Sequence, residues 1–149
     1  MTKGIISAAL NNDILISTLL GWVTAQGIKI GIGTIREKQF DFRWLLGTGG
    51  MPSAHAAGVA SLATAIGIEF GFDSALFALG LTFAVVTMFD AQGVRRAAGK
   101  QASILNKLIS EHPENIKVQE KRLIELLGHT PIEVIAGAFV GILVALSYL

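Results

Sequence analysis

The chain contains no cysteine, so neither disulfide bonds nor thiolate metal sites are available to it. Charged side chains are also scarce: they make up 15% of the sequence, whereas soluble domains carry roughly 25%. More than half of the residues are hydrophobic (52%), and the mean hydropathy is +0.59. This composition excludes an ordinary soluble domain, and the length indicates one integral membrane domain over residues 1–149.

Four apolar stretches are long enough to cross a bilayer, which takes about 20 predominantly apolar residues. They cover about residues 14–35, 53–72, 74–91 and 130–149. Only a short linker separates the second stretch from the third, so these two are expected to form a helical hairpin. Lys29 lies near one end of the first stretch, where its long side chain would either snorkel to the surface or face inward.

The segment 94–127 is not expected to span the membrane. Ile104, Leu105, Leu108 and Ile109 form an apolar stripe at helical spacing between polar residues. One or two amphipathic helices are therefore predicted in this insert, in the cytoplasm or at the membrane interface. Together with the four spans they define an all-α fold, an integral membrane helical bundle.

The basic residues predict the orientation of the bundle. Three lie between the first and second spans and seven between the third and fourth, so these two loops hold ten of the twelve Lys and Arg residues. With four spans, both loops fall on the same side of the membrane. The positive-inside rule then places both loops in the cytoplasm and both termini outside. The expected location is a bacterial cytoplasmic membrane, with the two loops facing the cytoplasm.

Two histidines occupy matching positions, each where a polar loop runs into an apolar, helix-length segment. His55 follows Gly49-Gly50-Met51-Pro52-Ser53-Ala54, and His129 lies between Gly128 and Thr130-Pro131. Imidazole can donate, accept or attack near neutral pH. A single histidine at such a place is more often an interface or capping residue, but the match between the two favours chemistry at a membrane surface.

The order of the basic residues and histidines resembles a known family. Six residues separate Arg36 from Arg43, Pro52-Ser53-Ala54-His55 follows, and three residues separate His129 from Glu133. This pattern resembles the type 2 phosphatidic acid phosphatase superfamily, which includes the vanadium haloperoxidases and carries K-x6-R-P, P-S-G-H and S-R-x5-H-x3-D. The segments MPSAH, FDAQGVRRAAGKQA and LGHTPIEVIAGA resemble its small divergent branch, and this resemblance covers nearly the whole chain.

Several positions depart from the superfamily pattern. Arg36 stands in place of the family lysine, Trp44 in place of proline, and Ala54 in place of glycine. Glu133 replaces the aspartate and adds a methylene to the carboxylate side chain. In the third motif Arg122 is one residue too far from His129, so Arg95 and Arg96 remain alternatives for that arginine.

The resemblance implies a role for each site residue. His129 would attack phosphorus and form a phosphohistidine, and His55 would protonate the leaving group and then activate water. Glu133 would either orient His129 or cap its own helix, and the sequence favours the two equally. Asp90 is expected to form a structural salt bridge with an arginine. The phosphate-binding candidates are Arg36, Lys38, Arg43, Ser53, Arg95, Arg96, Lys100 and Arg122.

The predicted function is that of a membrane lipid phosphatase that hydrolyses a lipid phosphate or prenyl pyrophosphate at the cytoplasmic face. No cofactor, metal or nucleic-acid partner is expected. The alternative is a non-catalytic membrane protein that binds anionic lipid headgroups or phosphate. Proton-linked transport is the weaker possibility, because the ionisable residues cluster at one face. Gly137 and Gly141 form a G-x-x-x-G pattern that is expected to pack within the chain, with a homo-oligomer as the alternative.

Overall fold

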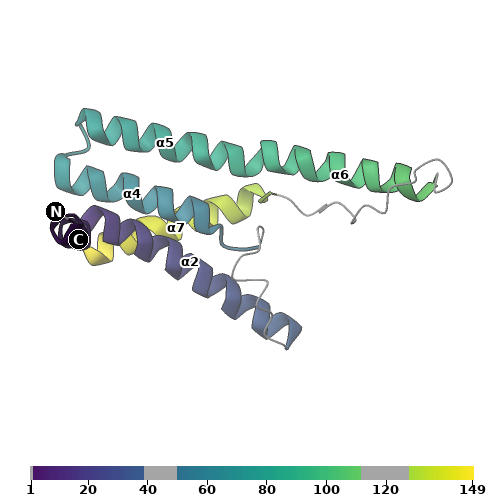
Figure 1. Cartoon of the computed structure of the whole chain (residues 1–149), viewed down its shortest axis with the longest axis horizontal. Coiled ribbons are helices and arrows are strands. Elements are labelled where there is room, and N and C mark those ends of the chain that lie inside the picture. Colours follow the sequence, from purple (N-terminus) through teal and green to yellow (C-terminus); the bar gives the residue numbers. More distant parts are fainter. Residues whose placement is uncertain (1, 39–49, 112–127) are drawn as a thin grey trace.

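The computed structural model describes residues 2–38, 50–111 and 128–149, and every regular element in this part of the chain is a helix. The helices are α1 (Thr2–Leu10), α2 (Asp13–Glu37), α4 (Ala54–Phe70), α5 (Ala75–Gln92), α6 (Val94–Glu111) and α7 (Pro131–Tyr148). Figure 1 shows α2, α4, α5 and α7 gathered into an elongated bundle. The prediction of an all-α membrane bundle is confirmed.

Three segments are long and apolar enough to cross a membrane by length and composition: Asp13–Glu37, Ala75–Leu108 and Pro131–Tyr148. The second predicted span forms the shorter apolar helix α4, which has 17 residues. Polar side chains start these helices: Asn12, Ser53, Ser74 and Thr130 each accept a backbone N–H from the first turn. Such residues satisfy amides that have no partner inside the helix, and they fix where the apolar helices begin.

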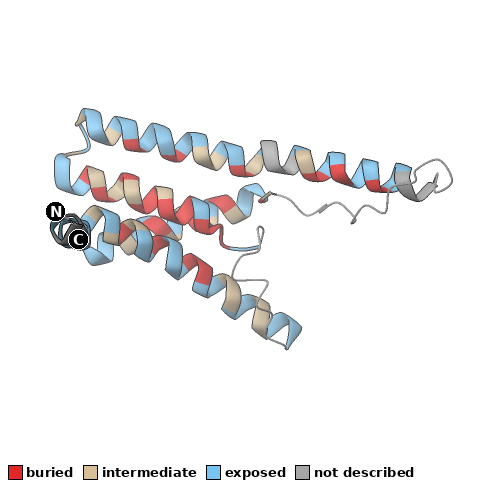
Figure 2. Ribbon diagram, viewed as in Figure 1, coloured by how far each residue is buried: buried red, intermediate tan, exposed pale blue. Residues whose placement is uncertain are grey.

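Helix α4 lies between the other helices and packs against α2, α5 and α7. Its buried residues are all small: Ala54, Ala56, Ala57, Gly58, Ala60, Ser61, Ala63, Ala65 and Gly67. Large apolar side chains such as Val23, Leu79, Phe83, Phe139 and Leu146 are exposed on the outside of the bundle. Figure 2 shows that buried residues run along most of α4. This distribution is typical of a lipid-facing bundle. Lipid tails are as apolar as the protein interior, so large apolar side chains gain little by being buried, whereas small residues let the helices pack closely.

The two glycines of the G-x-x-x-G pattern bring α7 against α4. A Cβ on Gly137 would overlap the carbonyl oxygen of Ser53, and a Cβ on Gly141 would overlap that of Ala57. Only glycine allows the two backbones to approach this closely. The expectation that this pattern packs within the chain is therefore confirmed.

A buried pair of hydroxyl groups joins α2 to α4. The Ser61 hydroxyl donates to the Ser17 carbonyl oxygen (2.8 Å), and the Ser17 hydroxyl lies 2.9 Å from Ser61 Oγ and donates to it. Gly21 permits this contact, since a Cβ there would lie 2.8 Å from Cβ of Ser61. These contacts hold α2 close to α4 along the middle of the bundle.

Both histidine segments lie at the same end of the bundle, where α4 and α7 begin and α5 ends; we call this the histidine end. The two termini lie at the opposite end (Figure 1), where the Tyr148 hydroxyl donates to Asp13 (3.2 Å). Helix α6, which contains the predicted amphipathic stripe, continues from α5 after Gly93 and extends beyond the bundle (Figure 1). The polar insert therefore begins at the histidine end.

The cytoplasmic orientation of the histidine end is a prediction that cysteine labelling can test, because the chain has no native cysteine. Cysteines at Glu37 and Gln101, both exposed near that end, should react only with reagents that reach the cytoplasm. A cysteine at Asp73, in the turn between α4 and α5, should react from outside. Labelling of the Glu37 and Gln101 positions from opposite faces would contradict the shared orientation.

Candidate active site

The two histidines, far apart in sequence, meet where α4 and α7 begin. His55 is the second residue of α4, and His129 directly precedes the N-cap of α7. Their ring centroids lie 6.3 Å apart and the ring planes are tilted by 59°. His129 is buried whereas His55 is exposed. Because reacting atoms approach to about 3–3.5 Å before bond formation, rings at this separation can both contact one phosphoryl group.

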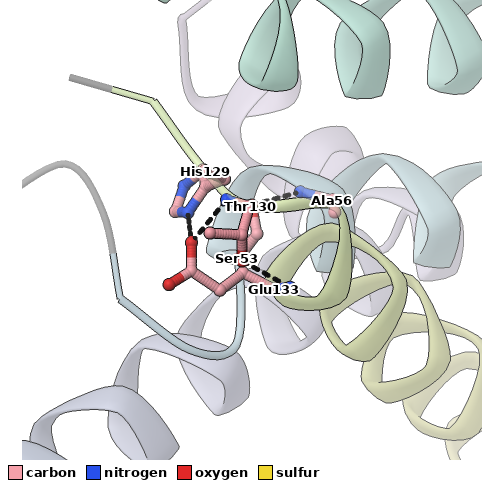
Figure 3. Close-up of polar contacts among 5 residues, drawn as sticks. All are labelled: Ser53, Ala56, His129, Thr130 and Glu133. Atoms are coloured by element: carbon pink, nitrogen blue, oxygen red, sulfur yellow. Dashed lines mark hydrogen bonds and ion pairs between the residues drawn. The ribbon is translucent and has the colours of Figure 1, made fainter. Parts of the chain in front are cut away.

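Glu133 makes two contacts through a single carboxylate oxygen. Its Oε2 lies 3.2 Å from Nδ1 of His129 and accepts the backbone N–H of Thr130 at 2.9 Å. In return, the Glu133 N–H donates to the Thr130 hydroxyl, which completes a capping box (Figure 3). The sequence left open whether Glu133 orients His129 or caps α7, and the structure shows that it contacts both groups.

This contact determines which nitrogen of His129 keeps a free lone pair when the ring is neutral. An ionised carboxylate only accepts hydrogen bonds, so the Nδ1 facing Glu133 must carry the hydrogen. In the neutral ring the other nitrogen, Nε2, then keeps its lone pair. The arrangement gives His129 one defined tautomer and leaves Nε2 as the nucleophilic or accepting atom.

The backbone of His129 is anchored to a third helix. Its N–H donates to the carbonyl oxygen of Ala91 in the last turn of α5 at 3.0 Å. Gly128, immediately before it, has φ 98°, a conformation that favours glycine. Sequence reasoning missed the Ala91 carbonyl, because a backbone acceptor has no signature in the residue type.

Ser53 links the two helices that carry the histidines. It is fully buried, its hydroxyl oxygen accepts the N–H of Ala56 at 3.3 Å, and its own N–H donates to the carbonyl oxygen of Glu133 at 2.9 Å. Ser53 therefore fixes the first turn of α4 against the first turn of α7, as part of the contacts in Figure 3. Its predicted contact with phosphate remains a prediction.

The basic candidates are distributed unevenly around the histidines. Arg36 and Lys38 are exposed at the end of α2, which diverges from α4 and α7 in Figure 1. Arg95 and Arg96 lie in the first turn of α6, and Lys100 is exposed one turn further on. Two further candidates, Arg43 and Arg122, lie outside the described residues. Binding of phosphate by each of these seven residues stays a prediction.

Two other expectations concern charge and metal. Asp90 is exposed near the end of α5, and its predicted salt bridge with an arginine stays a prediction. Within the described ranges, no group of three His, Cys, Asp or Glu side chains is placed to hold a metal ion.

Substitutions of Glu133 should separate its two contacts. Glutamine can still accept the Thr130 N–H, so Glu133→Gln should preserve stability, whereas Glu133→Ala should cost about 0.5–2 kcal/mol through the lost cap. Both variants lose the carboxylate that holds His129, and we expect turnover of a phosphate ester to fall roughly 10²–10⁴-fold. Thermal unfolding and kcat measured side by side test this. If Glu133→Gln retained full turnover, Glu133 would only cap α7 and would not be needed to orient His129.

The geometry defines a small helical membrane protein with a carboxylate-oriented histidine facing a second histidine at one end of the bundle. The chain matches the Divergent PAP2 family over residues 10–144 and belongs to it. It is 45% identical over 148 residues to the uncharacterized membrane protein YuiD of Bacillus subtilis (strain 168), covering 92% of this chain and 94% of that protein. No solved structure matches. The family resemblance seen in the motifs is thus confirmed.

Proposed function

We propose that this protein is a membrane phosphohydrolase that removes phosphate from a lipid phosphate or prenyl pyrophosphate through a phosphohistidine. The observation that carries the proposal is the Nδ1–Glu133 contact of His129, with the ring of His55 centred 6.3 Å away. Membership of a phosphatase-related family supports the same reaction class. Each of the three side chains then has a distinct role.

In the first step Nε2 of His129 attacks phosphorus, and the bond from phosphorus to the leaving oxygen breaks. His55, in its imidazolium form, donates a proton to that oxygen. The alcohol or phosphate therefore leaves with one negative charge fewer than it would carry unprotonated. The imidazole of His129 becomes positively charged as the P–N bond forms. The carboxylate of Glu133 stabilises this charge through its contact with Nδ1.

In the second step His55, now neutral, accepts a proton from water. The water oxygen attacks phosphorus, the P–N bond breaks, and inorganic phosphate leaves. His129 returns to its neutral form, and His55 is protonated again for the next cycle. The sum of the two steps is hydrolysis of one phosphate ester or anhydride by one water, with no oxidant or reductant.

The location of the site suits a substrate with an apolar tail. The histidines lie at one end of helices whose outer faces carry exposed large apolar residues, including Ile132 and Ile135 in the first turns of α7. A phosphorylated headgroup at the membrane surface reaches such an end while its hydrocarbon chain remains in the bilayer. A membrane-anchored phosphate therefore fits this site better than a freely soluble one.

The experiment is a phosphate-release assay with purified protein in detergent, in the presence of a chelator. A panel should include phosphatidic acid, a prenyl pyrophosphate and the soluble p-nitrophenyl phosphate. We expect hydrolysis of at least one lipid substrate without added divalent metal, and competitive inhibition by vanadate, which mimics five-coordinate phosphorus. If the wild-type protein bound lipid phosphate but hydrolysed no substrate in the panel, a binding function would replace this proposal.

A further inference from the structure

Helix α6 carries a stripe of large apolar side chains on its exposed surface. Ile104, Leu105 and Leu108 are 61%, 48% and 48% exposed. Because Leu108 follows the other two by four and three residues, all three share one face of the helix. The buried residues of the same stretch include Ala102, which is small, and Asn106, which is polar. A helix of a soluble domain shows the opposite distribution, with its large apolar side chains buried.

The length of the helix places this stripe outside the membrane span. The segment Ala75–Leu108, which contains α5 and most of α6, has 34 residues, or about 50 Å at 1.5 Å per residue. A hydrocarbon core about 30 Å thick takes up about 20 of these residues, and about 26 even at a tilt of about 40°. In the structure α6 continues along the line of α5 beyond the bundle (Figure 1). In that arrangement the stripe would face water.

Basic residues border the stripe. Lys100 is four residues before Ile104 and Lys107 is three residues after it, so both of these exposed lysines lie beside the stripe on one flank. The helix also has two arginines in its first turn and a single acidic residue, Glu111. Helices that lie on anionic bilayers have this pattern: the apolar face enters the boundary between headgroups and acyl chains, and the lysine stems extend to the phosphates.

We propose that α6 docks on the anionic membrane surface at the histidine end, with Ile104, Leu105 and Leu108 inserted between the lipids. The cytoplasmic leaflet is negatively charged and attracts basic residues near its surface. Because α6 is joined to a membrane-spanning helix, this surface is within its reach without a separate encounter. A second copy of α6 fits the stripe less well, since it would bring four basic residues and one acidic residue against the same charges.

Docking requires the chain to change direction at Gly93. This residue lies between the end of α5 at Gln92 and the start of α6 at Val94, and glycine adopts backbone conformations that other residues resist. The His129 N–H donates to the carbonyl oxygen of Ala91, on the α5 side of Gly93, so this contact is kept when α6 turns. The inference concerns where α6 lies, and it holds whether or not the protein hydrolyses phosphate.

The test locates α6 in vesicles that contain the full-length protein. A fluorophore is attached to a single cysteine at Leu105, on the stripe, or at Ser103, an exposed residue on the opposite side of α6. Vesicles of phosphatidylcholine alone are compared with vesicles that also contain phosphatidylglycerol. In the anionic vesicles a nitroxide lipid labelled near its headgroup should quench the Leu105 label, and the Ser103 label should stay accessible to acrylamide in water. Without phosphatidylglycerol, quenching of the Leu105 label by the nitroxide lipid should be weaker.

Substitution of the flanking lysines tests the contribution of charge. In the anionic vesicles Lys100→Gln and Lys107→Gln should each lower the ratio of docked to undocked Leu105 label roughly fivefold. A label at Leu79, which is exposed on the outer face of α5, is the matched control. Its quenching by a nitroxide lipid labelled deep in the acyl chain should be the same in both kinds of vesicle and in both variants.

Three outcomes would overturn the proposal. The first is a Leu105 label as accessible to acrylamide in anionic vesicles as the Ser103 label. The second is quenching of the Leu105 label that is equal in the two kinds of vesicle. The third is a Leu105 label that is shielded from acrylamide but not quenched by the nitroxide lipid, because protein, such as a second copy, would then cover the stripe. A repeat with the label at Leu108 covers the case in which labelling at Leu105 disturbs the helix.

Discussion

The His129→Ala variant is expected to release no phosphate above background and to form no covalent phosphoprotein. Nδ1 of His129 lies 3.2 Å from a carboxylate oxygen of Glu133, and in the proposed mechanism the other ring nitrogen of His129 is the nucleophile. Removing a nucleophile that forms a covalent intermediate removes the reaction path itself. Phosphate release and incorporation of radiolabelled phosphate into protein measure the two losses.

The His129→Ala protein should remain folded, which makes the result interpretable. The contact with Ala91 uses the backbone N–H of His129, which alanine keeps. The capping box between Thr130 and Glu133 also remains, so α7 still begins at the same residue. An unchanged elution profile and melting midpoint provide the control. Residual turnover close to wild type in a folded variant would show that His129 is not the nucleophile.

The His55→Ala variant should slow turnover of a lipid phosphate by roughly 10²–10⁴-fold, the usual effect of a lost general acid–base group. The loss should be smaller in the first step for p-nitrophenyl phosphate, because nitrophenolate leaves without protonation. The rate of the variant should also fall more steeply with increasing leaving-group pKa than the rate of the wild type, because poor leaving groups need protonation most. Because His55 is exposed, its replacement should leave stability unchanged. Burst kinetics with the two substrates separate the two steps.

A different pattern would point to another role for His55. Equal losses for the lipid phosphate and the nitrophenyl ester, with a raised KM and an unchanged kcat, would indicate that His55 binds phosphate without transferring a proton. Turnover at the wild-type level with both substrates would remove His55 from the mechanism.

The helices could be predicted from local patterns, and their relation to one another only in part. Apolar length and the capping residues Asn12, Ser53, Ser74 and Thr130 place the beginnings of the long helices. The continuation of α5 into α6 was not predicted. Gly93 between them has φ −86° and ψ −71°, in the right-handed helical region, so the chain direction is preserved despite the change from apolar to polar residues.

In the candidate site, too, contacts between residues close in sequence could be predicted, whereas contacts that depend on helix packing could not. The pairing of His129 with Glu133 follows from their separation of four residues at the start of α7, where His129 directly precedes the N-cap, and the sequence suggested it. The Ala91 carbonyl and the bridging N–H of Ser53 are backbone groups, which no residue pattern reveals. The position of Lys29 beside Gly50 depends on how α2 packs on α4, and that packing is set by small residues such as Gly21 and Ser61. The spacing of Arg36 in the sequence does not reveal that the end of α2, where Arg36 lies, diverges from α4 and α7.

Trapping the covalent intermediate tests the central claim most directly. The His55→Ala variant should be mixed with radiolabelled p-nitrophenyl phosphate, denatured in alkali, which preserves a phosphorus–nitrogen bond, and digested for mass spectrometry. Because water is no longer activated, the label should accumulate on one peptide, with phosphate on the ring of His129. The doubly substituted His55→Ala, His129→Ala protein should take up none. Absence of label from the single variant while it still releases nitrophenol, or label on any residue other than His129, would contradict the phosphohistidine mechanism.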